Sequence, residues 1–288
     1  MVTRRQVILG AGAGVAGVAL GGASSAVGLD LVPPTAYAAT VRDAHLREDA
    51  GAAGPYSRPA RLGIRQVIWS TEPVGAYAAI SFDDGPYPEF TPRILKALAA
   101  AGVQATFFAM GYNAHRHPEL IRDILADGHE IGNHTWSHLD QTGLDGPAIR
   151  DQIVRGKDEL EQLTGASLMG FRPPRGELTG YAQRVCAELG YDAYLWSLER
   201  GPSGTSTPAA VTAHLVQNVQ PGDILDLHDG IGRGTFSPGS SGSHALIARR
   251  EVEVQALPTV LREIKAKGIT LTSCTGLLSR STPTRAGP

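Results

Sequence analysis

Short apolar runs alternate with amphipathic stretches along the chain from about residue 64 onward. The amphipathic stretches repeat apolar residues at helical spacing, as Leu120, Ile121, Ile124 and Leu125 do. The apolar runs have the length of buried strands and predict strands at 77–82, 105–109, 129–133, 168–172, 193–197, 223–228 and 269–273. The stretches between them predict helices at 91–101, 118–126, 147–163, 180–189, 208–219 and 251–267.

Helix-boundary residues support this assignment. Thr91-Pro92 predicts an N-cap followed by a proline in the first turn, and glycines 102, 128, 190 and 268 follow predicted helix ends. Strands that alternate with helices predict an α/β fold with a mainly parallel sheet covered by helices. In such folds the active site collects at the carboxyl ends of the strands.

The first 38 residues differ from the rest in composition. Arg4 and Arg5 precede an uncharged, Ala- and Gly-rich run at 6–29, and Ala36-Tyr37-Ala38 matches an A-x-A cleavage site. We therefore predict that 1–38 is a twin-arginine export signal cleaved near Ala38. The twin-arginine machinery would then be a partner, and the mature protein would be secreted to the extracellular space or cell wall. The alternative is an uncleaved membrane helix, for which the run is weakly apolar.

The remainder divides into three predicted parts. Residues 39–63 mix Ala, Gly, Pro and charge without periodicity and predict an extended segment. Residues 64–280 predict a single folded domain, and 281–288 predict a C-terminal tail.

Composition narrows the class of protein. With 288 residues, 42% of them hydrophobic, the chain can bury a sizeable core. The net charge is −2 and no Lys/Arg-rich run is present, which argues against a nucleic-acid partner. Cys186 and Cys274 are too few for a thiolate metal site. They are either a disulfide, which export permits, or two free buried thiols. The sequence does not define an oligomeric state.

Polar side chains with chemical potential gather where predicted strands end. The residues that share this position are Asp83 and Asp84, His134 and His138, Arg172, and His228. Surface polar residues scattered at random would not follow this pattern. We therefore expect these side chains to meet at one edge of the sheet.

The spacing of these residues predicts a metal site. His134 and His138 are four residues apart, so on one helical turn both rings can reach one metal ion, and a carboxylate is expected as the third ligand. Three protein ligands leave a position for water, as in catalytic zinc sites. Asp83 and Asp84 can converge only if the chain turns, and Gly85-Pro86 supplies a turn. One carboxylate can then bind metal while the other meets the water.

These motifs resemble those of the polysaccharide deacetylase family, which is carbohydrate esterase family 4 and has a NodB-type homology domain. The first, second, third and fifth family motifs resemble Ser81-Phe82-Asp83-Asp84-Gly85-Pro86, His134-Thr135-Trp136-Ser137-His138, Arg172-Pro173-Pro174-Arg175-Gly176 and Leu225-Asp226-Leu227-His228. The resemblance runs from about residue 64 to residue 278. It implies a distorted (β/α)7 barrel in a single domain.

The resemblance also implies a role for each matching residue. Asp84, His134 and His138 would bind one divalent ion, usually zinc, and Asp83 would be the general base. His228 would be the general acid, and Arg172 would hold Asp83 ionised. The backbone N–H of Arg175 would help to stabilise the oxyanion. Trp136 and Leu227 would lie near the substrate, although Trp136 is equally explained as a core aromatic residue.

Two positions depart from the family pattern. Arg175 stands where the family usually has an aromatic residue. Glu199-Arg200-Gly201-Pro202-Ser203 lacks the usual Asp-Trp of the fourth motif, whose aspartate partners the acid histidine. Asp226 lies two residues before His228 on a predicted strand, so both side chains point to the same face. We therefore hypothesise that Asp226 is the new partner of His228, with Glu199 as second candidate. The alternative is that Asp226 caps a neighbouring loop.

The leading functional prediction is metal-dependent hydrolysis of N-acetyl groups on an amino-sugar polymer such as peptidoglycan or chitin. The same chemistry would serve an O-acetyl xylan esterase. A sugar-binding homologue with weakened catalysis is the third alternative, which the altered fourth motif favours and the intact acid, base and ligands oppose.

Overall fold

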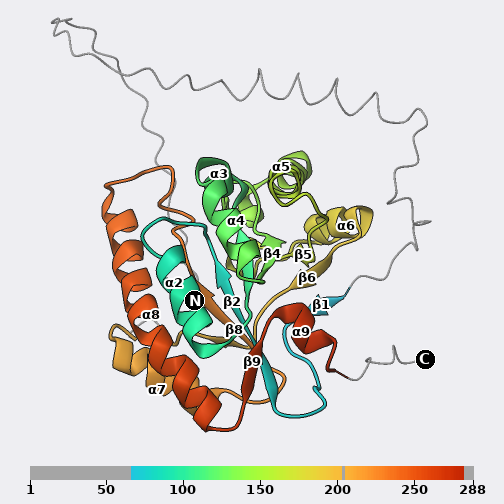
Figure 1. Ribbon diagram of the computed structural model, residues 1–288. Helices are drawn as coiled ribbons and strands as arrows, with labels where there is room; N and C mark the ends of the chain where they lie inside the picture. The colour runs from blue at the N-terminus through green and yellow to red at the C-terminus, as the bar shows by residue number, and fades with distance from the viewer. Residues whose placement is uncertain (1–65, 203–204, 282–288) are drawn as a thin grey trace, which may run out of the picture. The chain divides into compact units, whose positions relative to one another are not determined.

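A curled sheet of parallel strands lies at the centre of the described residues, which in the computed structural model are 66–202 and 205–281 (Figure 1). The strand order is β1-β6-β5-β4-β3-β2-β8-β7, with β9 beside β2, and all of these pairings are parallel. The bounds are β1 Val67–Ile68, β2 Tyr77–Asp83, β3 Thr106–Ala109, β4 Glu130–Asn133, β5 Gly170–Phe171, β6 Asp192–Tyr194, β7 Leu198–Glu199, β8 Ile224–His228 and β9 Thr270–Thr272.

The predicted α/β class is confirmed, and the sheet is an open, curled form of the distorted (β/α)7 barrel. All seven predicted strands are present, and the short strands β1 and β7 extend the two ends of the sheet. The predicted export signal at 1–38 and the extended segment at 39–63 lie outside the described residues, as do residues 282–288 of the predicted tail.

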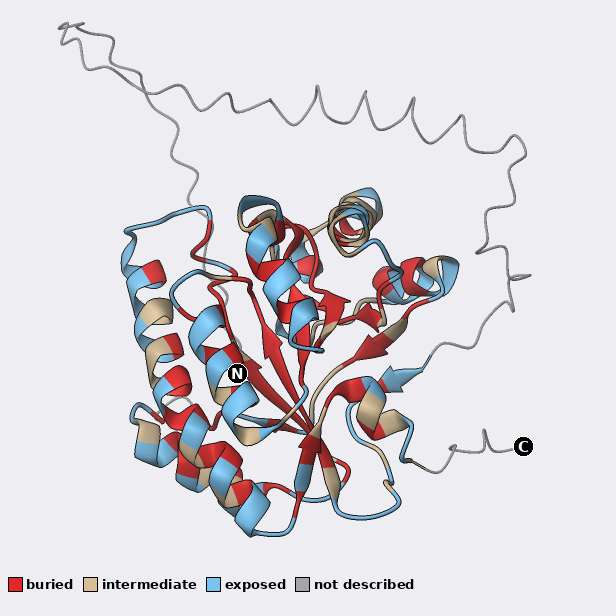
Figure 2. Ribbon diagram, in the orientation of Figure 1, coloured by how far each residue is buried: buried red, intermediate tan, exposed pale blue. Residues whose placement is uncertain are grey.

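Helices α2 to α8 cover the outer face of the sheet and turn their buried sides toward it, whereas Cys274 and Leu277 of α9 pack in a smaller apolar cluster on the other face (Figure 2). Their bounds are α2 Thr91–Ala101, α3 Gly111–Arg116, α4 Pro118–Ala126, α5 Gly146–Thr164, α6 Gly180–Leu189, α7 Pro208–Asn218, α8 Ser241–Ala266 and α9 Cys274–Leu278. The six predicted helices are all present. The prediction missed α3 and α9, which are too short to show periodicity. It also placed the start of α8 at residue 251 instead of Ser241, because the Gly and Ser residues before 251 have low helix propensity.

Thr91 does not act as the predicted N-cap of α2. The N-cap is Phe90, and Thr91 is the first helical residue. Its hydroxyl oxygen accepts a hydrogen bond from the Tyr87 backbone N–H and donates one to Asp229 Oδ2 at 2.6 Å. The side chain therefore ties α2 to the end of β8 instead of capping the helix.

Strand alternation divides the sheet into two faces with different roles. On β2 and β8, Phe82 and Leu227 belong to the large apolar core beneath the helices. The opposite, inner face begins with a smaller apolar cluster that includes Ala79 and Ile224. Farther along these strands the same face carries Asp83 and other charged groups. Because side chains alternate along a strand, the inner face changes from apolar to charged toward the carboxyl ends.

The described residues contain two cysteines that form no disulfide, and no span suited to a membrane. Cys186 and Cys274 are both buried and no disulfide joins them, which confirms the alternative of two buried thiols. No helix among the described residues is long and apolar enough to cross a membrane.

Helix α5 packs closely against the loop that follows β4, and this contact shapes the site. Asn133 donates to the Ile153 carbonyl at 2.8 Å, and the Trp136 backbone N–H donates to the Gln152 carbonyl at 2.8 Å. Gly156 permits the approach, because a Cβ there would lie 2.6 Å from Asn133 Oδ1 and 2.7 Å from the Thr135 carbonyl carbon. The helix thus holds the loop that carries His134 and His138.

Gly156→Ala should lower the free energy of unfolding by about 1–3 kcal/mol, because the added methyl group overpacks this contact. Helix propensity alone predicts the opposite sign, since Ala is favoured over Gly by about 1 kcal/mol. The measurement is denaturant unfolding of the two proteins. Gly180→Ala in α6 is the matched control, because no atom lies within 4 Å of its Cβ position. Equal stability of Gly156→Ala and the parent would contradict the packing argument.

Candidate metal centre and catalytic site

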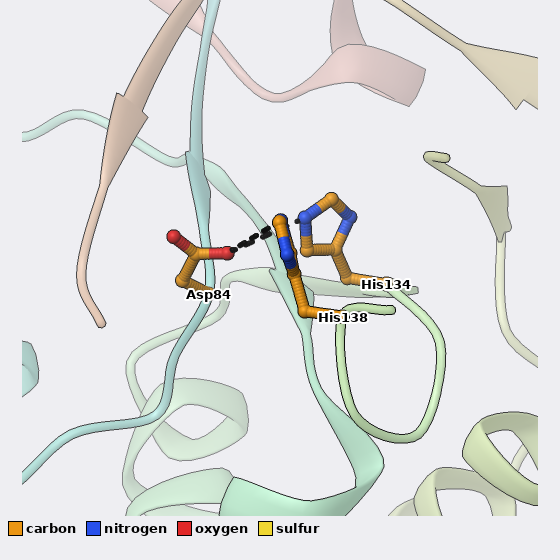
Figure 3. A group of neighbouring side chains, drawn as sticks. All are labelled: Asp84, His134 and His138. Carbon is orange, nitrogen blue, oxygen red and sulfur yellow. Dashed lines mark ion pairs between the residues drawn. The ribbon is translucent and has the colours of Figure 1, made fainter. Parts of the chain in front are cut away.

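Asp84, His134 and His138 converge at the carboxyl ends of β2 and β4 (Figure 3). One possible ligand atom from each of the three buried residues lies within 4.8 Å of the others. The Nε2 atoms of His134 and His138 lie 3.5 Å and 3.3 Å from Asp84 Oδ1. The predicted group of metal ligands is therefore brought together.

The backbone around this group adopts conformations that are costly for residues other than glycine. Asp84, Thr135, His138 and Arg175 have φ values of 74°, 69°, 56° and 61°, and they are the described non-glycine residues with positive φ. All four lie in the motif loops after β2, β4 and β5. Such conformations cost of the order of 1–3 kcal/mol each and persist where surrounding contacts enforce them. His134 and His138 therefore meet through a strained loop, and the predicted helical turn is wrong.

The three residues fit a divalent cation. His134 Nδ1 lies 2.8 Å from the Arg172 carbonyl oxygen, to which it can donate, so Nε2 keeps its lone pair toward Asp84. Asp84 Oδ1 and His138 Nδ1 are buried without a hydrogen-bond partner. An orphaned carboxylate oxygen between two imidazole nitrogens is the arrangement that a shared metal ion satisfies.

Two of the three ligands, Asp84 and His138, are deprotonated at pH 7, as metal binding requires. Burial raises the pKa of Asp84, but His138, His134 and Arg250 outweigh it, and the pKa lies well below its usual range. Burial lowers the pKa of the His138 imidazole to about 4, so the ring is neutral at pH 7. Burial also acts to lower the pKa of His134, yet the charges of Asp83 and Asp84 raise it overall. The same negative field would attract a cation.

Arg172 makes the predicted contact with Asp83. The guanidinium is fully buried, and Nη1 donates to Asp83 Oδ1 at 2.7 Å, to Ser81 Oγ at 2.8 Å and to Asp226 Oδ1 at 3.2 Å. Arg172 also donates to the carbonyl oxygens of Tyr194 and Leu195, at the end of β6. Its guanidinium carbon lies 4.0 Å from the centre of the Phe108 ring. A buried cation that donates to Asp83 and to several other acceptors fixes the Asp83 carboxylate in place.

His228 lies beside Asp83, because the two residues are register partners on β8 and β2. Its hydrogen-bond partner is Glu253 of α8: Glu253 Oε2 lies 2.9 Å from the His228 backbone nitrogen and 3.2 Å from Nδ1. The hypothesised hydrogen-bond pairing of Asp226 with His228 is therefore wrong, although the charge of Asp226 does raise the pKa of His228, as the hypothesis expected. Asp226 does lie on the same face of β8 as His228. It lies about 6.5 Å away along the strand, however, and its carboxylate accepts a hydrogen bond from Arg172 instead. The loop-cap alternative is wrong as well, and the second candidate, Glu199, is exposed on β7.

Three other predicted residues lie at the edge of the site or beneath it. Arg175 has the αL backbone described above, and its side chain extends outward to Asp140 Oδ2 at 2.6 Å. Trp136 is 8% exposed and stacks under the Arg155 guanidinium, which favours the core alternative. Leu227 is buried in the outer core, because alternation points it away from His228, so it offers no surface to a substrate.

The sequence interpretation missed two residues of α8. Glu253 contacts His228, and Arg250 Nη2 donates to Asp84 Oδ2 at 2.9 Å while Nη1 donates to Glu253 Oε1 at 3.1 Å. Both are buried. A signal was present in the helical pattern, because both charged residues occupy the phase of the apolar stripe that continues through Leu257 and Val260.

The chain resembles known deacetylases in sequence. Residues 71–194 match the family model described as polysaccharide deacetylase. A peptidoglycan-N-acetylglucosamine deacetylase of Bacillus cereus is 34% identical over 214 residues, which make up 74% of this chain and 92% of that protein. A chitooligosaccharide deacetylase of Sinorhizobium fredii is 36% identical over 154 residues, 52% of this chain and 71% of that protein.

Solved structures agree with these sequence relationships. The crystal structure of the peptidoglycan N-acetylglucosamine deacetylase Bc1960 matches with a TM-score of 0.65 and 28% identity, covering 75% of this chain and 94% of that chain. A family 4 pseudoenzyme from Bacillus anthracis has a TM-score of 0.63 at 21% identity, covers 75% of this chain and 70% of that chain, and shows the fold alone. The chain belongs to the polysaccharide deacetylase family.

His138→Ala should weaken binding of a divalent ion by more than the roughly 10–100-fold that loss of an outer-shell partner costs, because a direct ligand is lost. The parent protein should bind close to one equivalent. Titration with zinc and metal analysis of dialysed protein would measure both values. His244→Ala is the control, since His244 is an exposed histidine of α8. Unchanged stoichiometry and affinity in His138→Ala would place the metal elsewhere.

Proposed function

We propose that this chain hydrolyses N-acetyl groups on an amino-sugar polymer of the peptidoglycan or chitin type, with zinc as its metal ion. The observation that carries the proposal is the pairing of Asp83 and His228, an acceptor and a donor of protons, in register on adjacent strands beside the metal ligands. The relatives named for peptidoglycan and chitooligosaccharide deacetylation support this substrate class.

Two imidazoles and one carboxylate are a ligand set typical of catalytic zinc. A bound ion would polarise the acetyl carbonyl and lower the pKa of water. Asp83, held by Arg172, accepts a proton from the attacking water, and oxygen adds to the carbonyl carbon. His228 donates a proton to the amide nitrogen as the carbon–nitrogen bond breaks. The products are acetate and a free amine on the sugar.

An aromatic surface beside the site supports a carbohydrate substrate. Phe236 is 49% exposed, and its ring centroid lies 4.3 Å from that of Tyr112. Tyr112 meets Trp136 of the metal-binding loop edge to face at 6.1 Å. Flat rings with one exposed face offer the apolar side of a sugar ring a surface on which to lie.

Acetate release from chitin oligomers, peptidoglycan and acetylxylan tests the proposal. We expect release from one or both amino-sugar polymers, loss of release with a chelator and recovery with zinc. Release from acetylxylan alone would establish the esterase alternative, and sugar binding without release from any polymer would establish the weakened homologue.

Asp83→Asn should lower turnover by roughly 10²–10⁴-fold, the usual contribution of a general base. It should keep the metal, because Asp83 is not one of the three converging ligands. Turnover and metal content would be measured on the same preparation. If Asp83→Asn lost the metal and Asp84→Asn kept it, the roles of the two carboxylates would be exchanged.

We further propose that the chain is exported through the twin-arginine pathway and cleaved near Ala38. The paired arginines and the A-x-A site support this proposal. Replacing Arg4 and Arg5 together with Lys should block export, because the receptor reads the arginine pair. Secretion assays would measure the loss, and N-terminal sequencing of the secreted parent should begin near Ala39. Secreted protein that still carries Arg4 would contradict cleavage.

A further inference from the structure

Glu253 is a fully enclosed carboxylate that reaches His228 from outside the sheet. It is 2% exposed and lies on α8, 25 residues along the chain from His228. Its Oε2 atom accepts from the His228 backbone N–H at 2.9 Å and lies 3.2 Å from Nδ1 of the same residue. Two contacts from one oxygen to one residue fix both the position of the strand end and the plane of the ring.

This geometry also decides which ring nitrogen is available for chemistry. A carboxylate facing Nδ1 keeps a proton on that nitrogen. Nε2 then remains as the nitrogen that can carry the transferable proton. His228 has the required access, because 21% of its side chain is exposed while the Glu253 side chain is 1% exposed.

The second carboxylate oxygen of Glu253 is held by two arginines. Oε1 lies 3.0 Å from Arg200 Nε and 3.1 Å from Arg250 Nη1. Arg200 belongs to the stretch that lacks the fourth-motif carboxylate, and it is buried. The stretch that usually carries the aspartate thus places the positive charge of Arg200 near the site, and α8 places the negative charge of Glu253 against His228. With both cations on Oε1, Oε2 is left to His228.

We propose that Glu253 is the positioning residue of the general acid His228, holding the Nδ1 side of the ring and leaving Nε2 to donate its proton. This inference rests on the proposed function for the role of His228 as acid. The contact itself, and its effect on the imidazole, do not depend on the reaction.

Several charges act on His228, and Glu253 is the nearest acceptor. Burial and Arg250 lower the pKa of His228, but Glu253 and Asp226 outweigh them and raise the pKa to about 9. On β2, Asp83 is the register partner, and Asp84 also interacts electrostatically with the ring. A general acid must be protonated, so a raised pKa keeps activity at higher pH. Loss of the Glu253 charge should therefore move the alkaline limb of activity to lower pH.

The test compares Glu253→Gln with Glu251→Gln in the zinc-loaded full chain. Glu251 is the matched control, because it lies on the same helix but pairs with Arg93 at the surface. We expect turnover of Glu253→Gln to fall at least about tenfold, because Glu253 acts through a general acid that itself contributes roughly 10²–10⁴-fold. We expect its alkaline limb to move to lower pH and KM to change little. Glu251→Gln should match the parent.

A second readout does not require turnover. In ¹⁵N-histidine spectra, with His228 assigned from the missing signals of His228→Asn, the His228 titration midpoint should fall by about 1 pH unit or more in Glu253→Gln. This measurement separates the inference from the proposed function, because it stands even if no polymer releases acetate. An unchanged midpoint together with an unchanged alkaline limb would overturn the proposal.

Glu253→Asp covers the case in which Glu253→Gln fails to fold, because without the Glu253 charge the buried Arg200 loses its carboxylate partner and Arg250 keeps only Asp84. It keeps the charge but shortens the reach, so turnover should fall while the alkaline limb stays closer to that of the parent. Melting temperature and zinc content would be measured beside turnover. Parent-like turnover in folded, zinc-loaded Glu253→Asp would show that the position of the carboxylate does not matter and would also overturn the proposal.

Discussion

Three buried guanidinium groups organise the carboxyl ends of the central strands. Arg172, Arg200 and Arg250 are each at most 4% exposed. A charge of this kind is costly to bury unless it is paired and hydrogen-bonded. Arg172 holds Asp83 and Asp226, while Arg250 holds Asp84 and joins Arg200 at Glu253. The three arginines therefore fix the positions of Asp83, Asp84 and Glu253, which are the candidate base, a metal ligand and the partner of the candidate acid.

The carboxylates in this region outnumber the guanidinium groups, and the excess has consequences. Burial and the charge of Asp83 raise the pKa of Asp226, and burial raises the pKa of Asp229 to about 7. His228 gains its proton in the same field. A divalent ion between Asp84, His134 and His138 would offset part of this negative charge, since the orphaned Asp84 Oδ1 already faces both rings. Metal affinity and the protonation of the acid are thus linked through one charge distribution.

Periodicity was sufficient for the elements that bury a regular apolar pattern, and these include all seven predicted strands. It could not locate α3, whose six residues are too few for a stripe, or the Gly- and Ser-containing start of α8. The metal ligands were found because strand ends converge in a parallel sheet. The conformation of the loop that presents His138 was not found, because its positive φ values are held in part by contacts with α5 that are distant in sequence. Glu253 was missed because a charged residue in a helix usually lies on the solvated face.

Helix α8 explains how an altered fourth motif is compatible with an ordered acid site. Arg250 and Glu253 are three residues apart and therefore share one face of the helix. From that face Arg250 reaches Asp84 and the Gly230 carbonyl oxygen, and Glu253 reaches His228. One helical turn thus contacts a metal ligand, the loop after β8 and the candidate acid. A carboxylate on a rigid helix can replace one from a strand-end loop, because what His228 requires is an acceptor at Nδ1 and not a particular place in the sequence.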